Sequence, residues 1–266
     1  MVAAFRALGT ERVPPICDDP FARVLAGVLG FEDGLRYAAG FPDVGLFVAL
    51  RTALIDAETR RFLERGFLQV VVLGAGLDTR AARFGHPGLR FFEVDHPTTQ
   101  ADKLMRLGAL PGYPMENATY VPCDFAVHDF VERLDSSGFR ADLPAFFIWE
   151  GVTYYLPEEA VRATLRRISE RLHPRSVVVF DHVGKRMGSG ALKDAPSIAA
   201  REGVAEMGEP LLFGVNHVLP LLFEEGFRKA SIRTFDEIAL NLTGTYERSR
   251  TFRFQYFAMA SVAEPL

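Results

Sequence analysis

One stretch of 12 residues constrains the fold of this chain more than any other part of the sequence. Residues 69–80 read Gln-Val-Val-Val-Leu-Gly-Ala-Gly-Leu-Asp-Thr-Arg. The apolar run is too short for an ordinary helix and is typical of a strand buried on both faces of a parallel sheet. Gly74 and Gly76 follow at once, and helix-compatible residues begin near Asp78. A strand, a glycine turn and a helix in this order predict the cofactor-binding corner of a doubly wound α/β domain.

The same corner lacks the third glycine of the dinucleotide-binding fingerprint, because Thr79 stands at that position. The third glycine brings helix and strand close together where a pyrophosphate must sit. Its absence favours a nucleoside cofactor without phosphates, and S-adenosylmethionine is the commonest such ligand. A nicotinamide-dependent oxidoreductase is the weaker alternative.

Composition narrows the class of partner and the compartment. The chain has a formal net charge of −4 and no long basic run, which argues against a nucleic-acid partner. Its two cysteines, Cys17 and Cys123, form neither a disulfide framework nor a metal-ligand cluster, which fits a reducing cytoplasm. The apolar N-terminus is short and interrupted by Arg6, so it resembles neither a signal peptide nor a membrane span. We therefore expect a cytoplasmic protein that binds neither nucleic acid nor a membrane.

Apolar runs and turn residues alternate along most of the chain. This pattern predicts strands at residues 68–73, 89–94, 119–121, 145–149, 176–180, 227–234 and 251–260. It predicts helices within residues 18–66 and at 97–107, 127–134, 157–172 and 219–225. Such alternation implies right-handed crossovers and a doubly wound, mainly parallel sheet of these seven strands, with the last two as an antiparallel pair at one edge.

The alternation divides the chain into a core and its additions. Residues 1–66 are expected to form an N-terminal helical segment, and residues 67–183 a Rossmann-like core that binds the cofactor. Glycines then interrupt the pattern, so we interpret residues 184–214 as an insertion that forms a lid over the substrate. Residues 215–266 are expected to complete the core with a helix and the antiparallel strand pair.

Acidic residues end four consecutive predicted strands. Asp95, Asp124, Glu150 and Asp181 stand at or just beyond the C-terminal ends of the second to fifth strands. Ligands bind at that edge of open α/β sheets. A single acid there is commonly a turn or cap residue, but four in succession favour a binding site.

Asp95 is the strongest of these candidates. It lies 21 positions after Gly74, close to the spacing of about 20 at which an acidic residue binds a ribose hydroxyl. The alternative is an N-cap for the helix that follows. Glu93, which alternates with Asp95 along the strand, is a weaker candidate. Asp124 is expected to accept the adenine amino hydrogen, with Phe125 beside the ring, and its alternative is again a helix cap.

Four sequence blocks resemble a known family. They read Leu-Gly-Ala-Gly-Leu-Asp-Thr-Arg (73–80), Phe-Glu-Val-Asp-His-Pro (92–97), Trp-Glu-Gly-Val-Thr-Tyr-Tyr-Leu (149–156) and Gly-Glu-Pro-x-x-Phe-Gly (208–214). In order and spacing they resemble the signature blocks of the leucine carboxyl methyltransferase family, which belongs to the class I S-adenosylmethionine-dependent methyltransferases. This family includes eukaryotic enzymes that esterify a phosphatase C-terminal leucine, and bacterial O-methyltransferases of polyketide pathways. The resemblance covers residues from about 45 to 227, and the bacterial branch is the better match.

The resemblance implies a set of cofactor-binding residues. The methionine and ribose portions would lie against the glycine turn and the end of the second strand, formed by Gly74, Ala75, Gly76, Asp95 and His96. Asp124 and Phe125 would hold the adenine. Glu150 would lie near the ammonium group of the cofactor's amino-acid end.

Two arginines complete the set that the resemblance implies. Arg51 matches a family arginine that approaches the cofactor carboxylate, which a guanidinium fits bidentately. Without the family, Arg51 would be read as a surface residue whose stem lies along apolar neighbours. The eukaryotic branch also places an N-terminal lysine on the cofactor, and Arg6 is the candidate to replace it here.

Methyl transfer requires a nucleophile in line with the methyl–sulfur bond in a dry pocket. A carboxylate is already ionised at neutral pH, whereas a phenol with a pKa of about 10 would benefit from a base. His182 and His96 are candidate bases, and each has a structural role as its alternative. By the resemblance Tyr155 lies near the substrate, or else it is a packed aromatic at a helix entry. The leading hypothesis is an O-methyltransferase of a small-molecule carboxyl or hydroxyl group. The alternatives are a protein C-terminal leucine methyltransferase and a cofactor-binding homologue without transfer activity.

Overall fold

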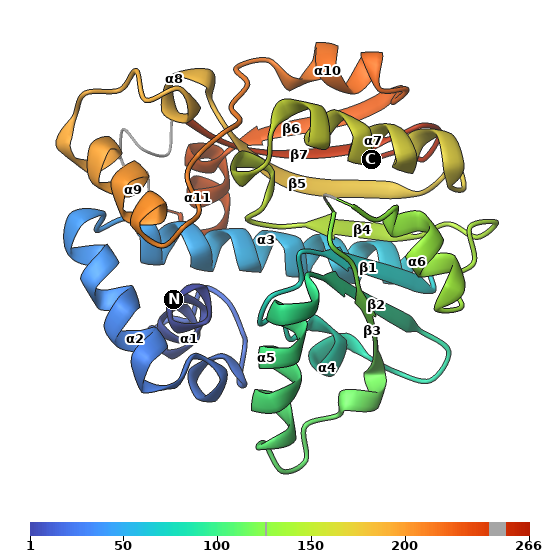
Figure 1. Cartoon of the computed structure of the whole chain (residues 1–266), viewed down its shortest axis with the longest axis horizontal. Helices are drawn as coiled ribbons and strands as arrows, with labels where there is room; N and C mark the ends of the chain where they lie inside the picture. The colour runs from blue at the N-terminus through green and yellow to red at the C-terminus, as the bar shows by residue number, and fades with distance from the viewer. Residues whose placement is uncertain (126, 245–253) are drawn as a thin grey trace.

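A single sheet forms the centre of the molecule in the computed structural model, which describes residues 1–125, 127–244 and 254–266 (Figure 1). Its strands in the described ranges are β1 (Gln69–Leu73), β2 (Arg90–Asp95), β3 (Ala118–Pro122), β4 (Phe146–Trp149), β5 (Val177–Val183), β6 (Lys229–Thr234) and β7 (Gln255–Ser261). Their order is β3-β2-β1-β4-β5-β7-β6. β7 runs antiparallel to β5 and β6, and the other pairs are parallel. The predicted fold class, a doubly wound and mainly parallel seven-stranded sheet, is confirmed.

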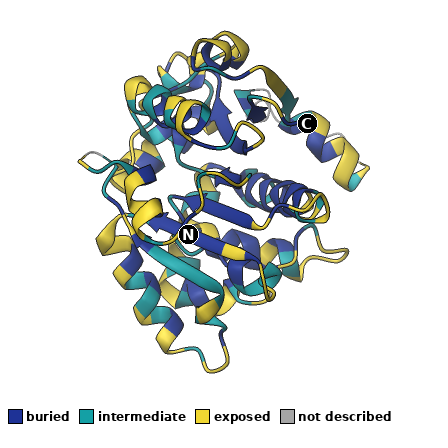
Figure 2. Ribbon diagram, turned by 90° about the vertical axis from the view of Figure 1, so that its right-hand side faces the viewer, coloured by how far each residue is buried: buried dark blue, intermediate teal, exposed yellow. Residues whose placement is uncertain are grey.

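Helices cover both faces of this sheet. Val70 and Val72 of β1 pack with one helical layer, and Val71 and Leu73 with the other, because side chains alternate along a strand. The first layer contains α3 (Val44–Glu64), α4 (Arg80–Phe84) and α11 (Phe235–Thr243). The second contains α6 (Phe130–Ser136), α7 (Glu158–Arg171) and α10 (Val218–Glu224). α5 (Pro97–Gly108) and the short 3-10 helix η1 (Met115–Asn117) connect β2 to β3. Figure 2 shows buried strands between helices whose outer sides are exposed.

β5 is longer than the sequence predicts. The prediction ends this strand at residue 180 and places Asp181 and His182 beyond it. β7 continues the antiparallel ladder past this point, with Tyr256 opposite His182, so β5 reaches Val183. The predicted end is wrong because pairing with a strand that is distant in the sequence, and not the local pattern, extends β5. Residues 251–253 of the last predicted strand lie outside the described residues.

Three helices precede the sheet, namely α1 (Val2–Glu11), α2 (Ala22–Gly40) and α3. The helices predicted within residues 18–66 correspond to α2 and α3, and α1 lies in the N-terminal helical segment expected at residues 1–66, although no separate helix was predicted there. α1 approaches α3 so closely that a Cβ atom on Gly9 would lie 2.6 Å from the Cβ of Ala49. In the described part of the chain no single helix has the length and apolar composition of a membrane span, and α2 with α3 passes that test only as a pair bent by 114°.

Residues 184–214 contain α8 (Lys185–Gly188) and α9 (Ala195–Glu206), and α9 lies beside α2 (Figure 1). The hydroxyl of Tyr37 on α2 donates to the carbonyl of Ala200 at 2.9 Å. A Cβ atom on Gly203 would lie 2.5 Å from the same tyrosine ring. Further along, the backbone N–H of Leu212 donates to the carbonyl of Tyr154 at 2.7 Å, within the 3-10 helix η2 (Thr153–Tyr155). The segment is therefore attached to α2 through α9 and, near its C-terminal end, to the loop that follows β4.

Candidate active site

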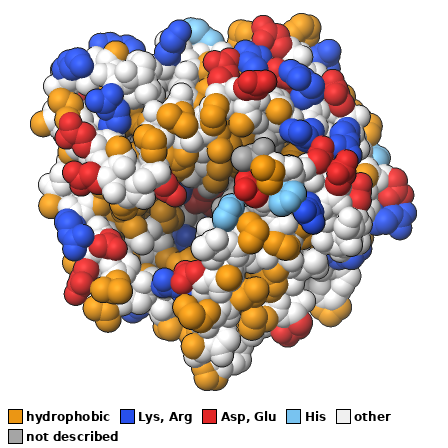
Figure 3. All heavy atoms as spheres, viewed as in Figure 1, with side chains coloured by type: hydrophobic (Ala, Val, Ile, Leu, Met, Phe, Trp, Pro, Cys, Tyr) orange, Lys and Arg blue, Asp and Glu red, His pale blue; other side chains and the backbone are white. Residues whose placement is uncertain are grey.

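The predicted strand-end residues form one row along the C-terminal edge of the parallel strands. The register of β1–β2, β2–β3, β1–β4 and β4–β5 brings the strand ends side by side. The row consists of Asp124, Asp95, Gly74, Glu150 and Asp181, in that order across the sheet. Figure 3, in the same view as Figure 1, shows a hollow over these strand ends, with charged side chains inside it and hydrophobic side chains around it.

The glycine turn is attached to the end of β2. The backbone N–H of Gly74 donates to the carbonyl of Val94 at 2.8 Å, and that of Gly76 donates to a carboxylate oxygen of Asp95. Gly74 and Gly76 have φ angles of 67° and 49°, in the left-handed region that glycine adopts readily. A Cβ atom on Gly74 would lie 2.6 Å from Val152, whereas one on Gly76 would meet open space. The turn therefore leaves room for a ligand above Gly76.

Asp95 binds the turn and does not cap α5. Its second carboxylate oxygen accepts the backbone N–H of His96 at 2.6 Å. The cap of α5 is His96 itself, whose Nδ1 accepts the N–H of Thr98 at 3.3 Å. Burial raises the pKa of Asp95, while the two N–H groups act in the opposite direction. Because a carboxylate offers about four lone-pair positions, Asp95 keeps acceptor capacity for a ligand hydroxyl.

The outer end of the row is more exposed than the centre. His96 Nε2 lies 3.8 Å from Asp124 Oδ2, and these side chains are 53% and 35% exposed. Phe125 is half-buried, and its ring centroid lies 6.2 Å from that of Phe130 on α6. The structure thus brings together the residues assigned from the sequence to ribose and adenine.

Arg51 lies at the inner end of the row, fully inside the protein. Its Nε donates to Glu150 at 2.8 Å, and its Nη1 donates to Asp181 at 2.9 Å and to the hydroxyl of Tyr154 at 3.0 Å. Burial alone would lower the pKa of Arg51, but Asp181, Tyr154 and Glu150 together raise it. Arg51 is only 3% exposed, so the alternative of a surface residue is wrong. The pair of Arg51 and Glu150 places one charge of each sign where the resemblance puts the cofactor's amino-acid end.

A second arginine, Arg80, was missed as a site residue although it ends the opening motif. It is 1% exposed and pairs with Glu150 at 2.8 Å, with Asp56 at 2.8 Å and with Asp78. Burial alone would raise the pKa of Glu150, but Arg80 and Arg51 outweigh it and lower that pKa. Asp56 is itself only 2% exposed and lies on α3.

Two other sequence candidates support the turn from within the protein. Arg6 pairs with Asp19 at 2.7 Å and donates to the carbonyl of Leu77. Glu93 is 1% exposed and pairs with Lys103 on α5. Both residues therefore contact the protein's own groups.

Tyr155 lies beside the segment 184–214. Its ring packs edge-on against Tyr154, with centroids 4.6 Å apart. Burial and the nearby carboxylate of Glu209 raise the pKa of Tyr155, so its hydroxyl stays protonated at neutral pH. Burial and the charge of Asp95 raise the pKa of Glu209. Glu209 is thus within electrostatic reach of both the glycine-turn side and the tyrosine side of the site.

His182 lies apart from these residues. Neighbouring side chains of a strand point to opposite faces, so His182 and Asp181 are on different faces of the sheet. The His182 ring stacks on Tyr256 with centroids 5.1 Å apart, and neither ring nitrogen has a hydrogen-bond partner among the described residues. Burial lowers the pKa of His182 to about 4. The structure therefore does not group this histidine with the acidic row.

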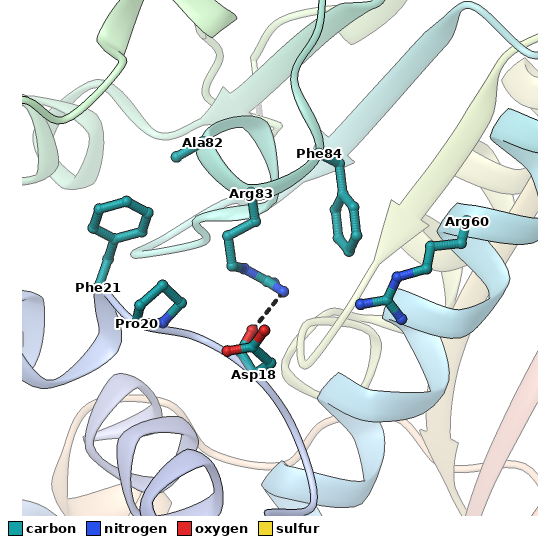
Figure 4. A pocket seen from close by; sticks show the side chains of 7 residues that line it. All are labelled: Asp18, Pro20, Phe21, Arg60, Ala82, Arg83 and Phe84. Atoms are coloured by element: carbon teal, nitrogen blue, oxygen red, sulfur yellow. Dashed lines mark hydrogen bonds between the residues drawn. The ribbon is translucent and has the colours of Figure 1, made fainter.

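Two cavities lie outside the row of strand ends. One of about 270 Å³ opens between α3, α4 and the segment before α2, where Arg83 donates to the carbonyl of Asp18 at 2.9 Å (Figure 4). Arg60 and Phe84 line the same cavity. The other, of about 460 Å³, lies between α2 and α9.

A family model described as leucine carboxyl methyltransferase matches residues 1–169. The chain belongs to the leucine carboxyl methyltransferase family. A relative from Mycolicibacterium smegmatis, named "Putative S-adenosyl-L-methionine-dependent methyltransferase", is 34% identical, with 76% of this chain and 72% of the relative covered. A relative of the same name from Mycobacterium tuberculosis is 33% identical over 68% of this chain, and the chain spans 64% of that protein's length.

A solved structure supports the fold of this leucine carboxyl methyltransferase family member. A DUF574 family protein from Streptomyces avermitilis superimposes with a TM-score of 0.66 at 16% identity, covering 91% of this chain and 96% of the other. At this identity the likeness concerns the fold alone. The family predicted from the four sequence blocks is confirmed by the family model and by the relative from Mycolicibacterium smegmatis.

Proposed function

We propose that this protein transfers a methyl group from S-adenosylmethionine to a carboxyl or hydroxyl oxygen of a small-molecule acceptor, such as a polyketide-like compound. The observation that carries the proposal is the row of acidic side chains beside the glycine turn, at the edge where this fold binds ligands. Family membership and the names of the relatives supply the cofactor. We also propose a cytoplasmic location, for which the two free, buried cysteines are the support.

The described residues fit the chemistry of this cofactor. Asp95 keeps lone pairs for the ribose hydroxyls, and the open space at Gly76 leaves room beside it. Asp124 and Phe125, with an acceptor oxygen and a ring, suit the adenine. When bound, S-adenosylmethionine supplies a methyl group on a positively charged sulfur. The surplus of acids along the row favours binding of that positive charge.

The amino-acid end of the cofactor carries both charges, and the inner end of the row offers a partner for each. Glu150 would receive the ammonium group and Arg51 the carboxylate. Both are already paired with each other, and Arg51 is also held by Asp181 and Tyr154. Binding would therefore exchange charge-assisted hydrogen bonds within a preformed network, so that no free charge of the protein has to be desolvated.

The chain's own groups would position the acceptor and exclude water. We propose residues 184–214 as the lid, and their hydrogen bonds to α2 and to η2, the 3-10 helix that contains Tyr155, support this. Tyr155 remains our candidate for contact with the acceptor, as a hydrogen-bond donor because its pKa is raised. A carboxylate acceptor would need no base. A hydroxyl acceptor would benefit from a base. His182 is a weaker candidate for it than the sequence alone indicates, since its side chain and that of Asp181 point to opposite faces of the sheet.

The first test is the choice of cofactor. Isothermal calorimetry with S-adenosylmethionine, S-adenosylhomocysteine and NAD(H) separates a methyltransferase from an oxidoreductase. We expect binding of the first two and none of NAD(H). Asp95→Ala should weaken the affinity roughly tenfold or more, on the scale of lost hydrogen bonds to a charged group. Binding of NAD(H) alone would refute the proposal.

The second test concerns the acceptor. Tritiated methyl transfer is measured to an acidic metabolite extract and to a peptide that ends in leucine. Treatment of the products with strong alkali then distinguishes methyl esters, which release methanol, from methyl ethers, which do not. Label in the metabolite fraction supports the proposal, and label in the peptide supports the protein methyltransferase alternative. Cofactor binding without transfer to either would favour the homologue that has lost transfer activity.

A further inference from the structure

A buried lysine contacts the end of the glycine turn, outside the set of residues proposed to hold the cofactor. Lys103 on α5 is 1% exposed. Its Nζ donates to the backbone carbonyl of Asp78 at 2.7 Å and pairs with the carboxylate of Glu93 on β2. The amide of Gln100, one turn earlier on α5, donates to the carbonyl of Glu93 at 3.3 Å. α5 is therefore bonded both to the strand and to the turn.

The contact through Lys103 is a second link between β2 and the glycine turn, in addition to the hydrogen bond from Gly76 to Asp95. Glu93 and Asp95 are two positions apart on β2, so their side chains leave the same face of the strand. Asp95 accepts the N–H of Gly76 directly, and Glu93 reaches the carbonyl of Asp78 through Lys103. The strand that presents the candidate ribose ligand is thus joined to the glycine turn at two successive points.

Burial of the Lys103–Glu93 ion pair costs free energy of desolvation, so packing alone does not explain why two charged residues stand here. Lys103 and Glu93 are both nearly inaccessible to water, and one carboxylate oxygen of Glu93 has no hydrogen-bond partner among the described residues. Burying such a pair costs desolvation energy, and apolar replacements are often no less stable. A pair of this kind is better explained by the geometry that it imposes on its neighbours.

We propose that Lys103 and Glu93 form a positioning pair that sets the separation of Asp95 from the glycine turn, and thereby the affinity for the cofactor. The inference rests on the proposed function, because the ligand is S-adenosylmethionine or its product. Both residues are 1% exposed, so they act through the backbone of the turn and through β2.

The charge state of Glu93 gives the pair a signature in pH. Burial raises the pKa of Glu93 to about 7, with Lys103 acting in the opposite direction. The groups that face it from the packed elements are Lys103 on α5, Asp78 in the turn, Asp95 on its own strand, Tyr113 after α5 and Tyr120 on β3. As the pH falls through about 7, Glu93 gains a proton and its attraction for Lys103 weakens. Cofactor affinity should then fall with it.

The test measures S-adenosylhomocysteine affinity by calorimetry and thermal stability without ligand, in Lys103→Met, Glu93→Gln and the double variant. We expect Lys103→Met to weaken binding roughly tenfold at about pH 8, as for lost hydrogen bonds to a charged group. The double variant should lose less than the sum of the single variants, because the two residues act together. Asp102→Asn is the matched control, since its pair with Arg106 lies on the same helix but is exposed. It should bind like the wild type.

The pH profile separates positioning from a merely structural role. Wild-type affinity should decline between about pH 8 and 6, and Glu93→Gln should lose that decline. If Lys103→Met fails to fold, this comparison still decides the question. The inference would be overturned if folded Lys103→Met bound S-adenosylhomocysteine with unchanged affinity, whether or not its stability was lower. It would also be overturned if Glu93→Gln kept the pH profile of the wild type. Absence of S-adenosylhomocysteine binding by the wild type would overturn both the inference and the proposed function, whereas loss of only the variant effects would leave the function intact.

Discussion

Arg51 shows how strongly a single residue can tie the site to the stability of the fold. Its guanidinium lies between Glu150 and Asp181, and its side chain is 3% exposed. Arg51→Met keeps much of the stem but leaves these two acids without that cation. Breaking a buried ion pair in this way costs about 3–5 kcal/mol. We expect a loss of that size in the free energy of unfolding, measured by urea denaturation.

The control for Arg51→Met is an arginine whose ion pair is in water. Arg36 pairs with Asp33 at 3.1 Å on α2, and these side chains are 77% and 53% exposed. Arg36→Met should change the free energy of unfolding by less than about 1 kcal/mol. Equal losses of unfolding free energy in Arg51→Met and Arg36→Met would mean that burial of the Arg51 ion pairs adds nothing to the stability of the fold.

His182 should make the fold less stable in acid. Its pKa is lowered from 6.5 to about 4 in the folded protein, so the unfolded chain binds the proton first as the pH falls. The contribution of neutral His182 to stability is therefore fully present above pH 6.5, and it declines as the pH falls from 6.5 to about 4. His182→Phe keeps a ring against Tyr256 and removes this loss, which amounts to about 2 kcal/mol at about pH 5. Urea midpoints at about pH 7 and 5 measure it.

The same variant tests the base that was predicted at this position. If His182 only packs, His182→Phe keeps both cofactor binding and methyl transfer. Lost transfer with intact binding would instead support the base. A wild-type stability that does not depend on pH in this range would contradict the argument from burial.

At residue scale, local spacing could predict some contacts and not others. Asp95 was found because its distance from Gly74 along the chain reflects one β-α-β unit. The bond between Arg51 and Asp181 joins residues 130 positions apart, and only the assembled sheet brings them together. Arg80 stood in the motif, but nothing local shows that it turns toward Glu150.

Among the elements, the contact of α9 with α2 depends on a missing side chain. A Cβ atom on Gly203 would lie 2.5 Å from the ring of Tyr37. Helix propensity alone would make Gly203→Ala stabilising by about 1 kcal/mol. Overpacking costs about 1–3 kcal/mol, and we expect it to dominate because the ring is held by its bond to Ala200. Thermal denaturation and limited proteolysis of residues 184–214 measure the effect.

Gly30→Ala is the matched control for this contact. Gly30 is also in a helix, α2, but its added Cβ would lie 3.5 Å from the nearest atoms, which is an ordinary contact. This substitution should be neutral or stabilising by up to about 1 kcal/mol. Stabilisation by Gly203→Ala of the same size would show that α9 is not packed tightly against α2.

Element prediction succeeded where a pattern is local and failed where it is not. The core strands were found because each is a short apolar run between turn residues. α11 was not predicted, because it follows β6 without a glycine or proline between them. Thr234 both ends the strand and caps the helix, accepting the N–H of Glu237 at 3.2 Å. Because Thr234 belongs to both elements, the sequence contains no separate turn residues that would mark the end of the strand and the start of the helix.

For the molecule as a whole, the candidate site combines distant parts of one chain. α1 holds the glycine turn through Arg6, α3 supplies Arg51, α5 supplies Lys103, and the loop after β4 supplies Glu150. The doubly wound order was predictable from the alternation of elements, and with it the edge where ligands bind. The attachment of residues 184–214 to α2 and to η2 depends on tertiary hydrogen bonds, which no sequence pattern specifies.

Because so many elements meet at the site, ligand binding should stabilise the whole fold. A ligand at about 100 times its Kd adds about 2.7 kcal/mol, and for a domain of this size each kcal/mol raises Tm by about 2–4 °C. We therefore expect S-adenosylhomocysteine at that concentration to raise Tm by about 5–10 °C, and NAD(H) to leave it unchanged. Asp95→Asn, with affinity reduced about tenfold, should lose about 1.4 kcal/mol of this stabilisation at the same ligand concentration. The ligand-induced rise in Tm depends only on the affinity of the site that the ligand occupies. If Asp95→Asn showed the same rise in Tm as the wild type, the ligand would bind elsewhere than at the end of β2.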